Sequence, residues 1–443
     1  MSSSTEAAPT GLSRSRWSGG RNLVVRRWVP VLGIAVAAFV LRLVWALHAN
    51  PVPVSDFFDY WTLARDLADH RQFGYPEPTA FFLPMHPLLL APFAAITDAF
   101  GFVRIATILV SSATVIPAAV VGRNVVGTER GAIIAAAGFA VFPTFVLFSP
   151  VLATEHLFIF LMVAAIALAT SRTTSLSMIA ATGIVLGLAQ LTRGEAVFYT
   201  PAFVLWFVFR DRKLAVADRL KPVAVLAAAI LVVLTPWWVR NAVVVDPSAG
   251  LSSSSGLNFY FAHNDSGNYG DFIDGNPLYG LPSAEASALG WELGLRHIRE
   301  HPLSLVEDVW VGTTRLFGAP DYAVFWSTQV RVGDGANDFT QGYVFGARTL
   351  GKLANLATLL LLVLAAASLA FMRTWSRPFT LLIVPLIAST WILRTVIYWA
   401  KPRYGYFITA MLIFAAAITI DRVIVVVRRT RLDTPEETGA PSR

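Results

Sequence analysis

Residues 28–47 read WVPVLGIAVAAFVLRLVWAL, and this apolar run decides the fold class. An α-helix needs roughly 20 such residues to cross a bilayer. The run is longer than a typical signal-peptide core and is not followed by a small-residue cleavage pattern, so we interpret it as an uncleaved first span. Further apolar runs of similar character lie near residues 103–121, 131–149, 152–170, 176–192, 195–209, 221–239, 351–371, 378–398 and 404–426.

The composition agrees with a multi-pass membrane protein. Of 443 residues, 55% are hydrophobic and only 14% are charged, and the mean hydropathy is +0.59. These values lie far outside ordinary globular usage. The chain has no cysteine, which excludes disulfides, a thiol nucleophile and thiolate metal ligands.

The formal charge of +7 reflects membrane topology better than a nucleic-acid partner. Basic residues gather at the two ends of the chain and between the apolar runs, as the positive-inside bias requires of cytoplasmic segments. We therefore expect a disordered cytoplasmic tail over 1–27, a transmembrane domain over 28–427 and a basic cytoplasmic tail over 428–443.

An eleventh apolar run, LPMHPLLLAPFAAITDAF at 83–100, contains three prolines, which disfavour a continuous spanning helix. If it spanned, every later loop would change sides and most basic loops would face outward, against the positive-inside bias. We therefore interpret 83–100 as an interfacial or re-entrant helix. The predicted fold is an all-α bundle of about 10–11 transmembrane helices with two long outer loops, 48–102 and 240–350.

The first outer loop begins with SDFFDYWTLA at 55–64. Apolar residues recur at helical spacing through this segment, which predicts a short amphipathic interfacial helix over 56–69. Asp56 and Asp59 share a face at its start. Acids also stabilise a helix N-terminus, so a purely structural role fits the same two residues.

Other polar residues lie at the outer ends of predicted spans. Charges there favour a cavity or a partner, although single long side chains can also snorkel to the headgroups. Two or three carboxylates and five or six cations at one membrane depth indicate a site for an anionic ligand. These residues are Arg42, Glu155, His156, Arg193, Glu195, Arg240, Asn241, Arg394, Lys401 and Arg403.

The second outer loop contains SSSSGLNFYFAHNDSGNYGDF at 252–272. Aromatic rings and amides such as those of Asn258 and Asn264 can bind sugars, but exposed loops have the same composition. Two later segments, within 283–302 and 303–317, have helical periodicity.

Metal ligands are less evident. His86, Glu155, His156 and His263 all lie on the outer side, but we find no HxxxH or His-plus-carboxylate spacing within one helix, so a structural role is favoured for each of the histidines. A divalent cation stays open as a cofactor.

Several motifs in order along residues 28–270 resemble the GT-C glycosyltransferases, in particular the lipid-linked-sugar transferases related to protein O-mannosyltransferases and to the enzymes that add aminoarabinose to lipid A. The motifs are DYWTLARDL (59–67), PTAFFLPMHPLLLAPF (78–93), SPVLATEHLF (149–158), LGLAQLTRGEAVFYTPAF (186–203), LTPWWVRN (234–241) and GLNFYFAHNDSGNYG (256–270).

This resemblance implies an inverting membrane enzyme that moves a sugar from a polyprenyl-phosphate carrier to an acceptor hydroxyl on a glycan, glycolipid or protein. It implies Asp56 as catalytic base and Glu155 as a second outer acid. The expected phosphate ligands are Arg42, Arg193, Arg240, Lys401 and Arg403. The expected substrate contacts are Asp59, Tyr60, His86, His156, Asn241, Asn258, Asn264 and Tyr404.

Two other classes remain open. A transporter or flippase of lipid-linked sugars would favour two related halves with charges at the bilayer midplane, whereas these charges lie near outer helix ends and no internal repeat is evident. A non-catalytic envelope scaffold would need no chemistry at Asp56. The preference for Ala, Val and Arg indicates a GC-rich bacterial source, and hence an inner-membrane location with the outer face toward the periplasm or cell exterior.

Overall fold

The computed structural model describes residues 16–171, 175–211, 213–267, 269, 275–318, 321–333, 335 and 337–433. The larger parts of both predicted tails, 1–15 and 434–443, lie outside these residues. The first helix already begins at Arg16 and the last ends at Asp433, so helix extends into both predicted tail segments.

Helices dominate the described part of the chain. Those of the bundle are α1 (Arg16–Ala49), α4 (Phe100–Ala113), α5 (Val115–Val126), α6 (Glu129–Val141), α7 (Pro143–Phe148), α8 (Thr154–Ala169), α9 (Leu176–Thr192), η1 (Gly194–Tyr199), α10 (Thr200–Phe209), α11 (Val216–Val244), α16 (Ala347–Ala367), η2 (Ser368–Thr374), η3 (Phe379–Ile383), α17 (Val384–Ile392), η4 (Leu393–Ile397), η5 (Pro402–Gly405) and α18 (Tyr406–Asp433). Each predicted span coincides with one or more of them.

Within the described residues, six helices are long and apolar enough to cross a membrane: Trp28–Ala49, Phe100–Val126, Val216–Val244, Ala347–Thr374, Phe379–Ile397 and Pro402–Thr430. The predicted spans at 152–170, 176–192 and 195–209 fall on shorter apolar helices. The predicted span at 131–149 is divided between α6 and α7, because Phe142 leaves the helical region (ψ 121°) before Pro143. A residue before proline disfavours the α conformation.

Small residues let some bundle helices approach closely. A Cβ atom at Gly183 of α9 would lie 2.6 Å from the carbonyl oxygen of Leu226, and one at Gly187 would lie 2.7 Å from Cβ of Val233. Both contacts are with α11 and are too short for any larger residue. Small side chains at helix interfaces are typical of membrane bundles, where close packing must replace the hydrophobic effect.

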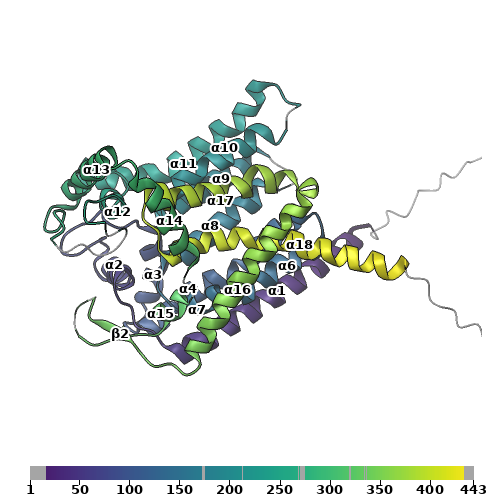
Figure 1. The fold of residues 1–443 in the computed structure, drawn as a ribbon, viewed down its shortest axis with the longest axis horizontal. Helices are drawn as coiled ribbons and strands as arrows, with labels where there is room; N and C mark the ends of the chain where they lie inside the picture. The colour runs from purple at the N-terminus through teal and green to yellow at the C-terminus, as the bar shows by residue number, and fades with distance from the viewer. Residues whose placement is uncertain are drawn as a thin grey trace, which may run out of the picture.

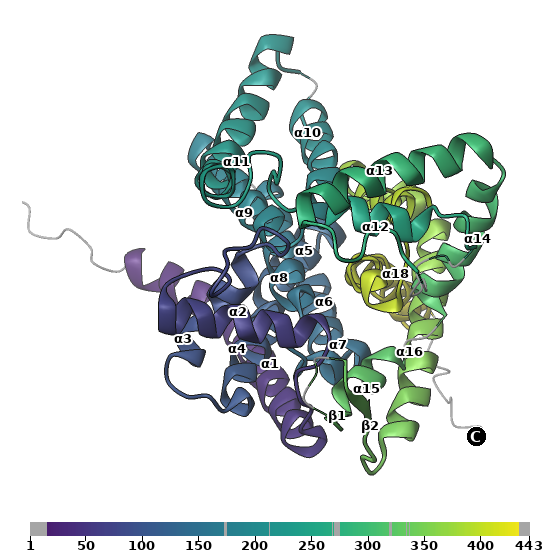
Figure 2. The same ribbon diagram turned by 90° about the vertical axis from the view of Figure 1, so that its left-hand side faces the viewer.

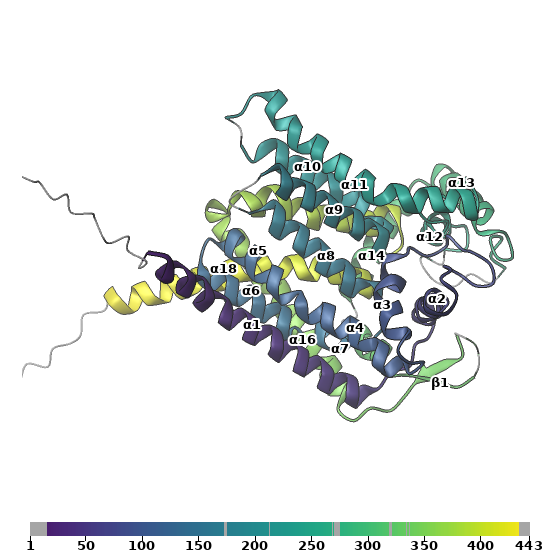
Figure 3. The same ribbon diagram turned by 180° about the vertical axis from the view of Figure 1, so that it is seen from behind.

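The remaining elements cover one end of the bundle. They are α2 (Asp56–His70), α3 (Met85–Ala94), α12 (Ser255–Ala262), α13 (Ser283–Glu300), α14 (Ser304–Phe317), α15 (Tyr322–Ser327) and a small antiparallel pair, β1 (Gln329–Arg331) with β2 (Phe339–Gln341). Figure 1 shows them at the end opposite the first and last described residues, and the reverse view agrees (Figure 3). The two predicted outer loops therefore share one end of the molecule.

Helices are present at both positions in the first outer loop where the sequence predicted them. Along α2, Phe57 and Ala64 are buried and Tyr60, Trp61 and Leu67 are half-buried, as the helical periodicity requires. Helix α3 has ten residues, or about 15 Å of length, which is too short to cross a bilayer. Seen from this end, α2 lies across the ends of the bundle helices, with α12, α13 and α14 over a different part of the same end (Figure 2).

Hydrogen bonds join the two outer loops to each other. The backbone N–H of Ser253 donates to the carbonyl of Ala80 (3.0 Å), and the Ser252 hydroxyl donates to the carbonyl of Phe81 (2.8 Å). Near the other end of the first loop, the N–H of Val52 donates to the carbonyl of Gln329 (3.2 Å). Residues far apart in sequence are thus held in one layer above the bundle.

Candidate active site

Six charged side chains form a continuous chain of alternating sign at this end of the bundle. Each comes from the end of a helix: Asp56 starts α2, Glu155 lies in the first turn of α8, Arg193 follows α9, and the others belong to η1, η4 and η5. We call this set the charge chain. In order of contact it consists of Asp56, Arg403, Glu155, Arg193, Glu195 and Arg394.

All but one of the contacts along the charge chain are shorter than 3 Å. Nη2 of Arg403 lies 2.6 Å from Oδ2 of Asp56, and Nε of the same arginine lies 3.8 Å from Oε1 of Glu155. Arg193 bridges the two glutamates, with Nη1 2.7 Å from Oε1 of Glu155 and Nε 2.9 Å from Oε1 of Glu195. Arg394 closes the chain with an ion pair to Glu195. The three cations are therefore balanced by three carboxylates.

The ring of Tyr404 lies among the three arginines. The guanidinium carbons of Arg394, Arg193 and Arg403 are 4.0, 5.1 and 5.2 Å from the ring centroid. An aromatic face attracts cations at these distances. Tyr404 therefore helps to hold three like charges close together.

Exposure distinguishes the three carboxylates. The side chain of Asp56 is 38% exposed, whereas those of Glu155 and Glu195 are 5% and 8% exposed. Ser55, directly before Asp56, has φ 52° and ψ −142°, a conformation that costs roughly 1–3 kcal/mol outside glycine. The charge chain thus ends at Asp56, whose carboxylate an external molecule can reach.

Asp59 and Tyr60 of α2 lie near Asp56, and Tyr60 in turn contacts His86 of α3. Burial, and to a lesser extent the charge of Asp56, raises the pKa of Asp59 to about 6. Burial also raises the pKa of Tyr60, with a smaller contribution from Asp56. The centroid of the Tyr60 ring lies 5.3 Å from that of His86. Burial lowers the pKa of His86 to about 3. At neutral pH this group presents a neutral phenol and a neutral imidazole beside the carboxylates.

The raised pKa of Asp59 predicts a pH-dependent stability. The folded protein binds this proton more tightly than the unfolded chain between about pH 4 and 6, so ionisation of Asp59 destabilises the fold as pH rises through 6. We expect Asp59→Asn to raise the apparent Tm relative to wild type at pH 7 and to give no gain at pH 4. Thermal unfolding in detergent across this range measures the difference, and an equal gain at both pH values would contradict the assignment.

Three of the expected site residues lie outside the charge chain and contact backbone instead. Arg42 is fully buried and donates to the carbonyls of Ala38, Phe139 and Ala140 and to the Ser111 hydroxyl. Arg240 donates to the carbonyls of Thr79 and Phe73, and Asn241 to those of Gly250 and Leu251. Arg42 joins helices of the bundle, whereas Arg240 and Asn241 tie the outer loops to α11.

We expect Arg42→Met to reduce stability without affecting a phosphate-bearing ligand. The substitution leaves buried carbonyl oxygens unpaired, which costs about 1–3 kcal/mol for each group left without a partner. The apparent Tm should fall, while the KM for a lipid-phosphate donor measured on the folded fraction should stay within about two-fold of wild type. A large rise in KM at unchanged Tm would return Arg42 to the phosphate site.

The other expected site residues contact residues outside the charge chain. The Nζ atom of Lys401 lies 4.1 Å from the ring centroid of Trp399, and the indole N–H of Trp399 donates to Oδ1 of Asn258 (2.9 Å). Asn264 accepts from the N–H of Ser266 (3.0 Å). The buried His156 packs against Phe148, with 5.4 Å between ring centroids. These contacts order the loops around the site.

The sequence placed Glu195 and Arg394 in the outer group of charges but assigned neither of them an individual role. Glu195 and Arg394 are visible in the sequence as charges at outer helix ends, but their pairing joins residues 199 positions apart.

His297 and His301 were overlooked in the sequence, although HIREH at 297–301 has HxxxH spacing. With Asp265 they form a group of the described residues that could hold a metal ion, and this group shares no member with the charge chain.

Comparison with solved structures identifies the architecture. An oligosaccharyltransferase, AglB from Archaeoglobus fulgidus, in complex with an inhibitory peptide and a dolichol-phosphate, aligns over 93% of this chain with a TM-score of 0.51 and 15% identity. A second structure of the A. fulgidus enzyme, tethered to an acceptor peptide, gives 93% coverage, a TM-score of 0.51 and 16% identity. This chain has a GT-C fold.

The GT-C fold predicted from the sequence is therefore confirmed. The present chain spans about half the length of the archaeal enzyme, covering 52% of it. ArnT from Cupriavidus metallidurans bound to undecaprenyl phosphate aligns over 92% of this chain and 81% of its own, with 14% identity and a TM-score of 0.44.

Family comparison supports the resemblance within one region. Residues 77–239 match the family described as dolichyl-phosphate-mannose-protein mannosyltransferase. No curated protein matches the chain as a relative. The matched region of this GT-C chain contains Glu155, Arg193 and Glu195, whereas Asp56, Arg394 and Arg403 reach the charge chain from outside it.

Proposed function

We propose that this protein is an inverting membrane glycosyltransferase that moves a sugar from a polyprenyl-phosphate-linked donor to an acceptor hydroxyl. The observation that carries the proposal is the charge chain, which ends in the accessible carboxylate of Asp56 paired with the buried Arg403. The GT-C fold and the family match over 77–239 support the same class of reaction.

The position of the charge chain suits a lipid-linked donor. Asp56 follows shortly after the candidate span Trp28–Ala49, Arg394 lies near the end of Phe379–Ile397, and Arg403 lies near the start of Pro402–Thr430. The ends of apolar spans lie at headgroup depth, where the phosphate of a polyprenyl carrier also lies. The donor would thus meet the charge chain without leaving the membrane.

In the proposed step, Asp56 accepts the proton of the acceptor hydroxyl as its oxygen attacks the anomeric carbon. The bond between that carbon and the phosphate oxygen breaks, and the leaving polyprenyl phosphate gains one negative charge. Asp56 loses one negative charge in the same step, so the pairing of Arg403 can pass from Asp56 to the phosphate. Such placement of a cation at developing charge is a large source of catalysis.

The buried, ion-paired part of the charge chain has a structural role in this proposal. Glu155 and Glu195 are buried and paired with Arg193 and Arg394, so they fix the position of Arg403 and Tyr404. Asp59 and Tyr60 stand beside Asp56, where they can orient the acceptor hydroxyl by hydrogen bonds.

The basic residues support an outward orientation of this site. Most of the Lys and Arg residues lie in the predicted cytoplasmic loops and at the two ends of the chain. Helix α2, which begins at Asp56, lies at the end of the bundle opposite the first and last described residues (Figure 1). By the positive-inside bias the site would face the periplasm or the cell exterior, and the preference for Ala, Val and Arg supports a bacterial inner membrane.

A donor panel tests this proposal. Purified protein in vesicles is incubated with radiolabelled polyprenyl-phosphate sugars and an envelope extract as the source of acceptors. We expect label from one donor to enter a glycan, glycolipid or protein fraction. Movement of intact donor across the vesicle membrane, with no label transferred, would instead support a flippase.

A further inference from the structure

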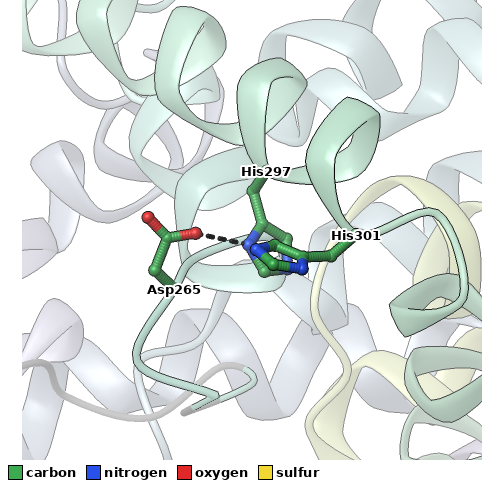
Figure 4. A group of neighbouring side chains, drawn as sticks. All are labelled: Asp265, His297 and His301. Atoms are coloured by element: carbon green, nitrogen blue, oxygen red, sulfur yellow. Dashed lines mark hydrogen bonds and ion pairs between the residues drawn. The ribbon is translucent and has the colours of Figure 1, made fainter.

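A group of potential metal ligands lies in the second outer loop. His297 and His301 come from the last turn of α13 and its C-cap, and Asp265 comes from the segment after α12. Figure 4 shows the carboxylate of Asp265 directed at the imidazole of His297, with His301 beside it. Nδ1 of His297 lies 2.6 Å from Oδ1 of Asp265, and the two imidazole centroids are 5.1 Å apart.

The chemistry and spacing of this group fit a divalent transition metal ion. Residues four apart on a helix project to one side, and paired histidines at this spacing bind zinc on helices of known metalloenzymes. One potential ligand atom from each of the three residues lies within 4.8 Å of the others. Two ligands of a tetrahedral zinc ion lie about 3.4 Å apart, given bonds of about 2.1 Å, so small side-chain rotations suffice.

The surroundings add negative charge and space. The group lines a cavity of about 740 Å³ whose wall also includes three acids, Glu300, Glu307 and Asp308, and one cation, Arg315. Acidic side chains around a cavity raise the local concentration of cations. The cavity leaves room for water or another oxygen ligand beside an ion held by only three protein groups.

We propose that Asp265, His297 and His301 form a Zn²⁺ site, with water from the cavity completing the coordination. The ion links the segment after α12 to the C-terminal end of α13, and it reinforces the contact that the exposed Asp265 makes with the half-buried His297. The site is distinct from the charge chain and does not depend on the proposed transfer reaction.

Zinc titration of the intact protein tests the site. The full chain is purified in detergent with an affinity tag that lacks histidine, treated with a chelator, and titrated with Zn²⁺ by calorimetry. We expect one tight site in wild type. Loss of a group that only supports a ligand lowers metal affinity about 10- to 100-fold, so loss of two ligands in His297→Ala/His301→Ala should lower it at least about 100-fold.

The double variant His48→Ala/His70→Ala is the matched control, since it removes two exposed histidines elsewhere at the same end of the molecule. It should bind Zn²⁺ as wild type does. Asp265→Asn provides a milder test in case the double variant misfolds, and it should weaken binding while Zn²⁺ raises the Tm of wild type more than that of the variant. Absence of a tight site in wild type, or equal binding by wild type, Asp265→Asn and the double variant, would overturn the proposal.

Discussion

Asp56→Asn should lower kcat/KM for sugar transfer by about 100- to 10,000-fold, the range that a general base contributes. Asparagine keeps the shape of the side chain and can still accept a hydrogen bond from Arg403, which lies 2.6 Å from Asp56. It cannot take the acceptor's proton. Donor binding should therefore survive while turnover is lost, and both can be measured on the same purified sample.

Asp69→Asn is the matched control for this experiment. Asp69 lies on the same helix and pairs with Arg65 at 2.7 Å, with a side chain 42% exposed. Loss of such a surface ion pair costs at most about 1 kcal/mol, so transfer should stay near wild type. If Asp56→Asn retains full transfer, the base lies elsewhere; if both variants lose it equally, the effect belongs to α2 as a whole.

Arg193→Met should cause the largest loss of stability among single substitutions in the charge chain. Arg193 bridges Glu155 and Glu195 and also donates to the Thr154 hydroxyl at 2.9 Å. Removing one partner of a buried ion pair costs about 3–5 kcal/mol, because a buried charge is left uncompensated. The apparent Tm in detergent should fall accordingly, and transfer should fall with the folded fraction or further.

Arg123→Met gives the comparison. Arg123 pairs with the exposed Glu129 at 2.8 Å, so the same change of side chain should alter stability by no more than about 1 kcal/mol. Equal Tm values for the two variants would show that Arg193 does not neutralise the buried glutamates.

The sequence was sufficient to predict the architecture, because each contributing signal is local. The apolar runs mark helices, the helical periodicity after Asp56 marks α2, and the prolines within 83–100 disfavour a continuous spanning helix, in agreement with the ten residues of α3. The distribution of Arg and Lys places both long loops at one end, which the structure bears out (Figure 1). The break between α6 and α7 was missed because a hydropathy run does not show where one residue leaves the helix.

The pairing within the site could not be read in the same way. Asp56 and Arg403 are 347 residues apart, and nothing in their local sequence favours this pair over Asp56 with Arg42. Both arginines lie near the outer ends of predicted spans, but one contacts backbone carbonyls and the other a carboxylate. Charged residues at helix ends predict the membrane depth of a site, whereas tertiary packing determines which of these residues pair with one another.

In contrast, two of the three residues in the potential metal site could be recognised from the local sequence. The spacing of His297 and His301 was present in the sequence as a local signal on a predicted helix, and only the third ligand required the fold. Asp265 lies 32 residues before His297, so its approach depends on how α13 packs against α12.

The most direct measurement of the central claim uses a donor labelled in both the sugar and the polyprenyl phosphate. The purified protein is given this donor and an acceptor, and released lipid phosphate, new glycoside and its anomeric configuration are measured together. We expect one polyprenyl phosphate released for each glycoside formed, with inverted configuration, and neither product from Asp56→Asn. Both labels crossing the membrane in intact donor, or a glycoside of retained configuration, would contradict a single displacement in which Asp56 is the base.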